Sequence, residues 1–115
     1  MGSAMTRRTG ANTIERFFED AAVRGSNDAM LRHATGTCRF DVVGVGSWLV
    51  RADHGAVSVS EARGPAPADS VLTASEDVFL RMTRGEQNPL TAFMQGRLQV
   101  TGQLPLAERF LHLFP

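Results

Sequence analysis

The sequence predicts one α+β domain in which an antiparallel sheet is covered on one face by helices. Apolar residues recur every three to four positions near both ends of the chain, which is the period of an amphipathic helix. Between these ends, apolar and polar residues alternate, which is the period of a strand. Helices and strands segregated in this way favour an α+β fold. A chain of 115 residues leaves room for a single domain.

The beginning of the chain predicts an arm followed by a helix. Residues 1–5 resemble a cloning remnant and residues 6–11 a flexible arm, so we expect the domain to cover residues 12–115. Asn12 is the expected N-cap, with Glu15 reaching back to it, and Gly25 is the expected stop. The apolar stripe of this helix consists of Ile14, Phe17, Phe18 and Ala21.

The middle of the chain predicts four strands. After a short helical turn near residues 28–32, alternation over residues 38–43, 48–51 and 57–60 indicates three antiparallel strands. Gly44 and Gly46 mark the first turn, and Asp53-His54-Gly55 closes a hairpin between the second and third strands. Residues 63–68 contain two prolines and form a loop, and residues 70–73 suit a fourth strand.

Helical spacing returns after residue 73. Thr73 and Glu76 fit a capping box, and Ser75 is a rival cap for the same helix. Asn88-Pro89 starts a second helix that ends at Gly96. Residues 97–101 alternate as a fifth strand, and Pro105 opens a last helix. One face of that last helix carries Leu106, Phe110 and Leu113.

Composition excludes several classes of function. Twelve basic and twelve acidic residues balance without a basic run, so we expect no nucleic-acid partner and no strong attraction to anionic lipid. No apolar run approaches the ~18 residues of a membrane span, and the single Cys38 favours a reducing cytoplasm. All basic residues are arginines, a bias that suggests a GC-rich, actinobacterial-like genome and leaves no lysine for Schiff-base chemistry.

Enzyme signatures are missing from the sequence. We find no P-loop, no paired-cysteine spacing, no His-Glu-x-x-His and no Gly-x-Ser-x-Gly. We therefore expect no cofactor, no metal and no catalytic set. If the protein were an enzyme, the first polar candidates would be His33, Asp41, Arg51 and Asp53. The plainer interpretation is that these residues are solvated, that Asp41, Arg51 and Asp53 pair across strands, and that Cys38 packs in the core.

The C-terminal half is rich in large, adaptable apolar side chains. Phe79, Met82, Leu90, Phe93, Met94, Leu98, Val100, Leu106, Phe110, Leu113 and Phe114 fall within 36 residues. Such residues fill cores, and they also line pockets for irregular ligands. Composition alone does not distinguish a filled core from a lined tunnel, so both interpretations stay open.

The order of motifs resembles a known family. Residues 69–80 look like its acidic residue, short strand and Ser-Glu-Asp helix start, and Gly85-x-x-Asn88-Pro89 looks like its turn between two helices. Residues 93–102 are similar to its hallmark, a helix ending in glycine, then a basic residue and an alternating strand. Residues 104–114 match its closing helix, and residues 36–40 and 48–50 resemble its first strands. The family is the sterol carrier protein 2 domain family, and the resemblance covers about residues 14–114.

This resemblance implies a five-stranded, mostly antiparallel sheet with helices packed over it and a hydrophobic tunnel between them. Members bind sterols, fatty acids, acyl-CoA or phospholipids without a shared catalytic set. The resemblance therefore implies ligand-binding roles for Phe40, Trp48, Phe79, Met82, Leu90, Phe93, Met94, Leu98, Val100 and Phe110. The short N-terminal region suggests a stand-alone bacterial member, and the final Leu113-Phe114-Pro115 departs from the Ser-Lys-Leu of peroxisomal members.

Three functions follow as hypotheses. The leading one is a cytoplasmic carrier for an apolar small molecule such as a lipid, a fatty acyl chain, a sterol, or an isoprenoid- or polyketide-like compound. The alternative is a small-pocket cyclase or isomerase of a bacterial biosynthetic pathway, which would act by holding a reactive chain folded and dry. A third is a regulatory module that binds a lipid and signals to a protein partner, which a stable homodimer would favour.

Overall fold

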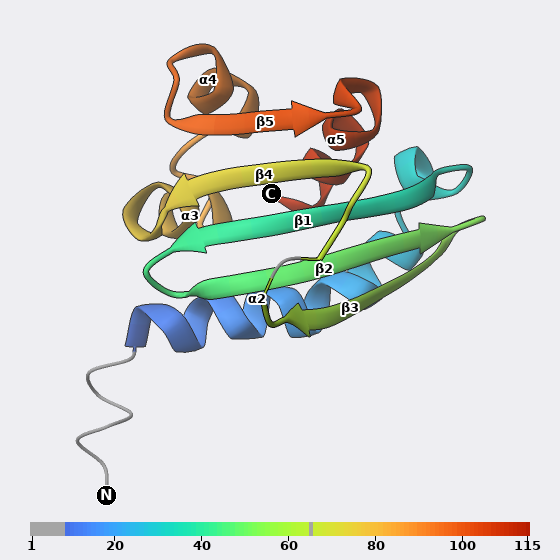
Figure 1. The fold of residues 1–115 in the computed structure, drawn as a ribbon, viewed down its shortest axis with the longest axis horizontal. Helices are drawn as coiled ribbons and strands as arrows, with labels where there is room; N and C mark the ends of the chain where they lie inside the picture. Colours follow the sequence, from blue (N-terminus) through green and yellow to red (C-terminus); the bar gives the residue numbers. More distant parts are fainter. Residues whose placement is uncertain (1–8, 65) are drawn as a thin grey trace, which may run out of the picture.

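Five strands form one sheet in a computed structural model that describes residues 9–64 and 66–115. The expected cloning remnant and residues 6–8 of the expected arm lie outside these described residues, whereas residues 9–11 of that arm belong to a helix. The strands are β1 (Thr35–Val43), β2 (Gly46–Asp53), β3 (Ala56–Ala62), β4 (Ser70–Ser75) and β5 (Leu98–Gly102). Their order across the sheet is β3-β2-β1-β4-β5, so β3 and β5 are the edges (Figure 1).

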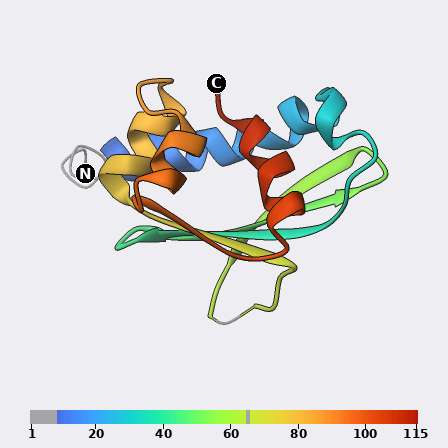
Figure 2. The same cartoon turned by 90° about the horizontal axis from the view of Figure 1, so that it is seen from above.

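The sheet is mixed rather than fully antiparallel. β1–β2, β2–β3 and β4–β5 pair antiparallel, whereas β1 and β4 pair parallel in the centre. A parallel pair needs a crossover connection. Here the connection between β3 and β4 passes over the face of the sheet that the helices leave open (Figure 2). The expectation of a mostly antiparallel, five-stranded sheet is confirmed. The alternation of apolar and polar residues identifies strands but does not indicate that β1 and β4 run parallel.

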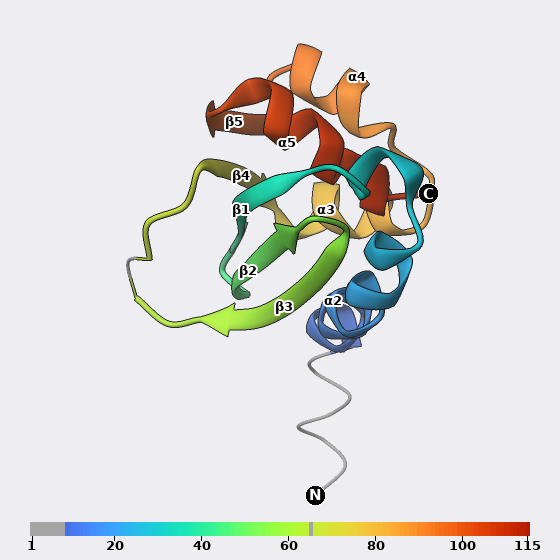
Figure 3. The same ribbon diagram turned by 90° about the vertical axis from the view of Figure 1, so that its right-hand side faces the viewer.

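The helices all lie on the other face of the sheet, as expected (Figure 2). They are α2 (Thr9–Ser26), η1 (Ala29–Leu31), α3 (Glu76–Thr83), α4 (Pro89–Met94), α5 (Leu104–Phe110) and η2 (Leu111–Leu113). The long helix α2 packs beside β3, and the short helices α4 and α5 lie near β5 at the opposite edge (Figure 3). The two ends of the sheet are therefore covered by very different lengths of helix.

Helix starts follow local capping chemistry, with two corrections. The Ser75 hydroxyl accepts a hydrogen bond from the Val78 N–H at 3.2 Å, so Ser75 caps α3 and Thr73 does not. The expected cap of α4 is confirmed, because the Asn88 side chain accepts the Thr91 N–H at 3.1 Å. The prediction for α2 is wrong, because the helix begins at Thr9 and Asn12 lies inside it. Apolar periodicity shows that a helix forms here but not at which residue it begins.

The core lies between the sheet and α2 and α3. Its centre is an aromatic cluster, whose neighbouring rings lie 4.6 to 6.3 Å apart between centroids. The aromatic cluster consists of Phe17, Phe18, Phe40, Trp48, Phe79 and Phe114. Arg24 closes it on the α2 side: its guanidinium lies 4.6 Å from the Phe17 ring centroid, and its Nε donates to the Leu113 carbonyl at 3.3 Å. These contacts join α2 to the last residues of the chain.

Candidate functional site

An apolar groove of about 270 Å³ lies between α4 and α5. We call it the α4–α5 groove. Its walls come from α4, β5, α5 and the start of η2, elements that the fold brings together at the β5 edge of the sheet. The lining residues are Leu90, Phe93, Val100, Leu104, Pro105, Ala107, Glu108 and Leu111. Seven of these eight side chains are apolar, and Glu108 is the exception.

The groove exists because its two helices are too short to bury their apolar residues. Ala92 is fully buried and seats α4, whereas Leu90 and Phe93 of the same helix are 51% and 37% exposed. Leu104 at the start of α5 is 50% exposed. Gly96, at a φ of 77°, ends α4 in a left-handed conformation that favours glycine. Large apolar residues gathered at a surface in this way typically mark a binding site.

A second hollow, of about 290 Å³, adjoins the α4–α5 groove. The two share Leu90, Glu108 and Leu111 as a common wall. The second hollow adds the polar side chains of Asn88 and His112, so we call it the polar hollow. Its other lining residues are Pro89, Phe114 and Pro115. Together the two hollows offer an apolar surface that leads into a polar one, which suits an amphiphilic ligand.

The structure divides the ten expected ligand-binding residues into three groups. The α4–α5 groove brings together Leu90, Phe93 and Val100. Met94 does not line the groove and is 78% exposed. The remaining six are buried in the core, namely Phe40, Trp48, Phe79, Met82, Leu98 and Phe110. An enclosed tunnel between sheet and helices stays a prediction.

Sequence reasoning missed five lining residues, all on or next to α5. They are Leu104, Pro105, Ala107, Glu108 and Leu111. A signal was present, because positions 104, 107, 108 and 111 recur with helical spacing. This stripe lies beside the buried face that carries Leu106 and Phe110. A helix with two apolar faces covers the core with one and offers the other to a ligand.

The candidate catalytic residues do not converge. His33 is exposed. Asp53 is hydrogen-bonded through its Oδ1 to Nδ1 of its exposed neighbour His54, at 2.7 Å. In the strand register Asp41 lies opposite Ser47, whereas Arg51 and Asp53 lie opposite Thr37 and Thr35. Asp41 and Asp53 are thus about 20 Å apart along the β1–β2 ladder. The expected pairing of Asp41 with Arg51 or Asp53 is therefore wrong.

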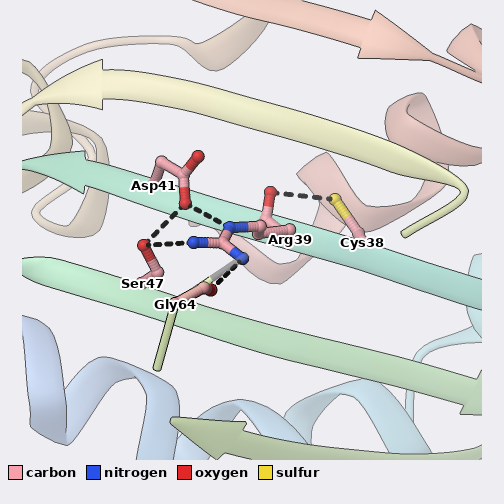
Figure 4. A network of polar contacts seen from close by, with 5 residues as sticks. All are labelled: Cys38, Arg39, Asp41, Ser47 and Gly64. Atoms are coloured by element: carbon pink, nitrogen blue, oxygen red, sulfur yellow. Dashed lines mark hydrogen bonds and ion pairs between the residues drawn. The ribbon is translucent and has the colours of Figure 1, made fainter. Parts of the chain in front are cut away.

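Asp41 instead belongs to a polar network on the open face of the sheet (Figure 4). Its Oδ1 accepts hydrogen bonds from Arg39 Nε at 2.7 Å and from the Ser47 hydroxyl at 2.6 Å. Arg39 also donates to the Gly64 carbonyl at 2.8 Å. This network fastens the β3–β4 connection onto the sheet.

The thiol of Cys38 lies in the core, as expected, on the helix-facing side of β1. Burial raises its pKa to about 12, because a thiolate would lose its hydration there. Within the described residues, no cluster of three or more histidine, cysteine, aspartate or glutamate side chains could hold a metal ion. None of the helices in this part of the chain combines the length and apolarity needed to cross a bilayer.

Comparisons with known proteins match this architecture. The model of the SCP-2 sterol transfer family matches residues 14–115. Hydroxysteroid dehydrogenase-like protein 2 of Danio rerio is 30% identical over 80 residues, which are 68% of this chain and 19% of that protein. Sterol carrier protein 2 of Homo sapiens is 34% identical over 67 residues, which are 58% of this chain and 12% of that protein. The chain thus spans less than a fifth of the length of either curated relative.

A solved structure shows the same fold. The solution structure of the sterol carrier protein domain 2 of Helicoverpa armigera superimposes with a TM-score of 0.71 at 23% identity. The superposition covers 88% of this chain and 84% of that one.

Proposed function

The chain belongs to the SCP-2 sterol transfer family, and we propose on that premise that it binds and carries an apolar small molecule whose apolar part lies in the α4–α5 groove. The motif resemblance drawn from the sequence is thereby confirmed. The ligand class in this proposal is a lipid, a fatty acyl chain, a sterol, or an isoprenoid- or polyketide-like compound. The proposal also keeps a single domain, a cytoplasmic location and no cofactor.

The observation that carries the proposal is the lining of the groove. Seven apolar side chains meet at one surface, and three of them, Leu90, Phe93 and Leu104, stay partly exposed to water. Covering apolar surface contributes about 25 cal/mol per Å². A micromolar affinity requires about 8 kcal/mol in total, so a lipid-sized apolar body that covers these side chains can reach it after the costs of association.

The size of the groove limits what it can enclose. Pockets that enclose drug-sized ligands have volumes of about 300–1,000 Å³, and the α4–α5 groove has about 270 Å³. It therefore suits a chain or one end of a ring system. A larger ligand would extend into the polar hollow, which shares the wall formed by Leu90, Glu108 and Leu111.

The enzyme alternative gains no support. Among its candidate residues, Asp41 lies near one end of the β1–β2 ladder, and Arg51 and Asp53 lie toward the other end. Asp41 also accepts hydrogen bonds from Arg39 and Ser47. None of them lines the α4–α5 groove.

Two substitutions on one helix test the proposal. We expect Phe93→Arg to weaken binding of a fluorescent apolar probe at least about tenfold, because it places a charge in the groove. Met94→Arg is the matched control, since Met94 neighbours Phe93 but lies outside the groove. We expect it to bind within about twofold of the parent protein, a change of about 0.4 kcal/mol or less. Circular dichroism and a thermal melt should show that both variants fold.

The proposal fails if Phe93→Arg binds the probe as well as Met94→Arg does. The ligand would then lie elsewhere, and the expected tunnel between the sheet and the helices would be the next place to test. Native mass spectrometry of freshly purified protein, followed by organic extraction, identifies any ligand that copurifies and its chemical class.

A further inference from the structure

We propose that Glu108 makes the α4–α5 groove selective for amphiphiles whose head group is neutral or positively charged and donates a hydrogen bond. A hydroxyl or an amine would be preferred over a carboxylate or a phosphate on the same apolar tail. This inference rests on the proposed function, because it concerns the ligand of the same groove.

Glu108 lies where the apolar surface ends. Among the described residues, it is the only charged one that lines the α4–α5 groove, and it also lines the polar hollow. An amphiphile whose tail lies against Phe93 and Val100 would place its head group near this shared wall. The head group would meet a carboxylate, which when ionised accepts hydrogen bonds and donates none.

The carboxylate of Glu108 has no protein partner among the described residues. Two other carboxylates, by contrast, form ion pairs with an arginine. Asp41 pairs with Arg39, and Asp77 pairs with Arg81 at 3.4 Å. Arg109, the next residue in α5, donates to the Met30 carbonyl at 3.4 Å instead. Glu108 is therefore free to accept a hydrogen bond from a ligand.

No arginine lines either hollow in the described part of the chain. The one basic side chain there is His112, one helical turn after Glu108. Anion-binding sites typically use arginine or lysine, so a fatty-acid carboxylate would find repulsion from Glu108 and no cation to offset it. A hydroxyl or an amine would find an acceptor. The charge pattern thus selects the head group, while the apolar wall accepts the tail.

The test uses three probes with the same tail, namely dodecylamine, dodecanol and dodecanoate, each below its micelle concentration. Binding is measured at low salt and pH 8, so that charge effects are weakly screened. Because the tail is constant, the ratio of affinities isolates the head group. We expect the parent protein to prefer the amine over the carboxylate by about tenfold, with the alcohol between them, as one nearby charge in a partly solvated site would produce.

The variant Glu108→Gln keeps the size of the side chain and removes its charge. We expect the amine-to-carboxylate ratio to fall below about threefold, because the amine loses an attraction and dodecanoate loses a repulsion. Glu86→Gln is the matched control, because Glu86 is exposed and outside both hollows and gives the same change in net charge. We expect it to keep the ratio of the parent protein, and high salt to reduce that ratio.

The inference is overturned if the parent protein binds all three probes equally or prefers dodecanoate. It is also overturned if Glu86→Gln lowers the ratio as much as Glu108→Gln, since the cause would then be net charge. Absence of binding of all three probes to folded protein overturns the proposed function and this inference with it. Binding without head-group preference overturns this inference alone.

Discussion

The aromatic cluster and the α4–α5 groove are built from similar residues but behave as opposites. Phe79, at the centre of the cluster, is 2% exposed, whereas Phe93 in the groove is 37% exposed. The ring of Phe79 lies within 6.3 Å, centroid to centroid, of Phe17, Phe18, Phe40 and Phe114. The structure gives Phe93 no ring contact within its described residues. Residue type therefore does not decide whether an apolar side chain becomes core or binding surface.

Helix length accounts for the difference. α2 has 18 residues and is about 27 Å long, and it runs along the β3 edge of the sheet, while α4 and α5 have 6 and 7 residues and are about 9 to 11 Å long (Figure 1). A long helix covers the strands beneath it and traps the side chains between. Two short helices seat themselves through Ala92 and Leu106 and leave a gap. One edge of the sheet is thus closed by buried side chains, and the other leaves apolar side chains partly exposed.

The largest effect should come from removing a ring of the aromatic cluster. Phe79→Ala should lower the free energy of unfolding by about 3–5 kcal/mol, because a buried ring leaves a cavity that its neighbours only partly fill. Phe93→Ala should cost about 1 kcal/mol or less, because Phe93 is already partly in water. Urea denaturation of both variants measures the contrast. Equal losses would show that the α4–α5 groove is a continuation of the core.

The next effect concerns pH. Burial raises the pKa of Cys38 to about 12 from an ordinary value of 9.0, so the folded state keeps its proton when the unfolded chain has lost it. The contribution of the buried thiol is fully present below about pH 9. It then falls by about 1.4 kcal/mol per pH unit until the folded thiol also ionises near pH 12. By pH 10 the protein should have lost about 1.4 kcal/mol of stability.

This chain allows a clean measurement, because it contains no lysine and no tyrosine to titrate in the same range. Unfolding free energies between pH 8 and 10.5, with reductant present, should fall in the parent protein. They should stay nearly level in Cys38→Ala, which keeps a small apolar side chain at the position. Parallel slopes for the two proteins would mean that the Cys38 thiol ionises as readily in the folded state as in the unfolded one.

The same contrast explains what could be predicted from the sequence. The strands of the core were predictable because alternation reports directly which face is buried, as Cys38, Phe40 and Val42 show. Caps were predictable where a local hydrogen bond decides them, as at Asn88. The parallel pairing of β1 with β4 was not, because it depends on contacts distant in sequence. Arg39 with Gly64 is one such contact, and Thr37 N–H with the Asp69 carboxylate at 2.9 Å is another.

The candidate site was predictable only in part for a related reason. Phe93 and Met94 are adjacent, and periodicity placed both on the apolar face of their helix. The structure turns Phe93 into the groove and leaves Met94 in solvent, because the orientation of a helix as short as α4 depends on its packing on β5. Phe40 and Phe79 resemble Phe93 in the sequence, yet α2 buries them. The local sequence around a residue does not show whether a helix distant in the chain will cover it.

The smallest expected effects come from the two helix caps, which share one chemistry but serve different regions. Ser75 caps α3, which carries Phe79 into the aromatic cluster, and Asn88 caps α4, which carries Leu90 and Phe93 into the groove. Replacing either residue by alanine removes one hydrogen bond to the helix backbone and costs about 1 kcal/mol locally. We expect the loss to appear in different measurements.

Ser75→Ala should lower the global free energy of unfolding by about 1 kcal/mol, since α3 unfolds together with the core. Asn88→Ala should change the global value by less, because a short peripheral helix opens locally. Its effect should appear as faster hydrogen exchange of the α4 amides and a few-fold loss of apolar-probe binding. Thr91→Ala is the control, because it removes an exposed side chain from α4 and keeps the capped amide. If Asn88→Ala and Ser75→Ala lower global stability equally, α4 unfolds only with the core, and the separation of the two regions does not hold.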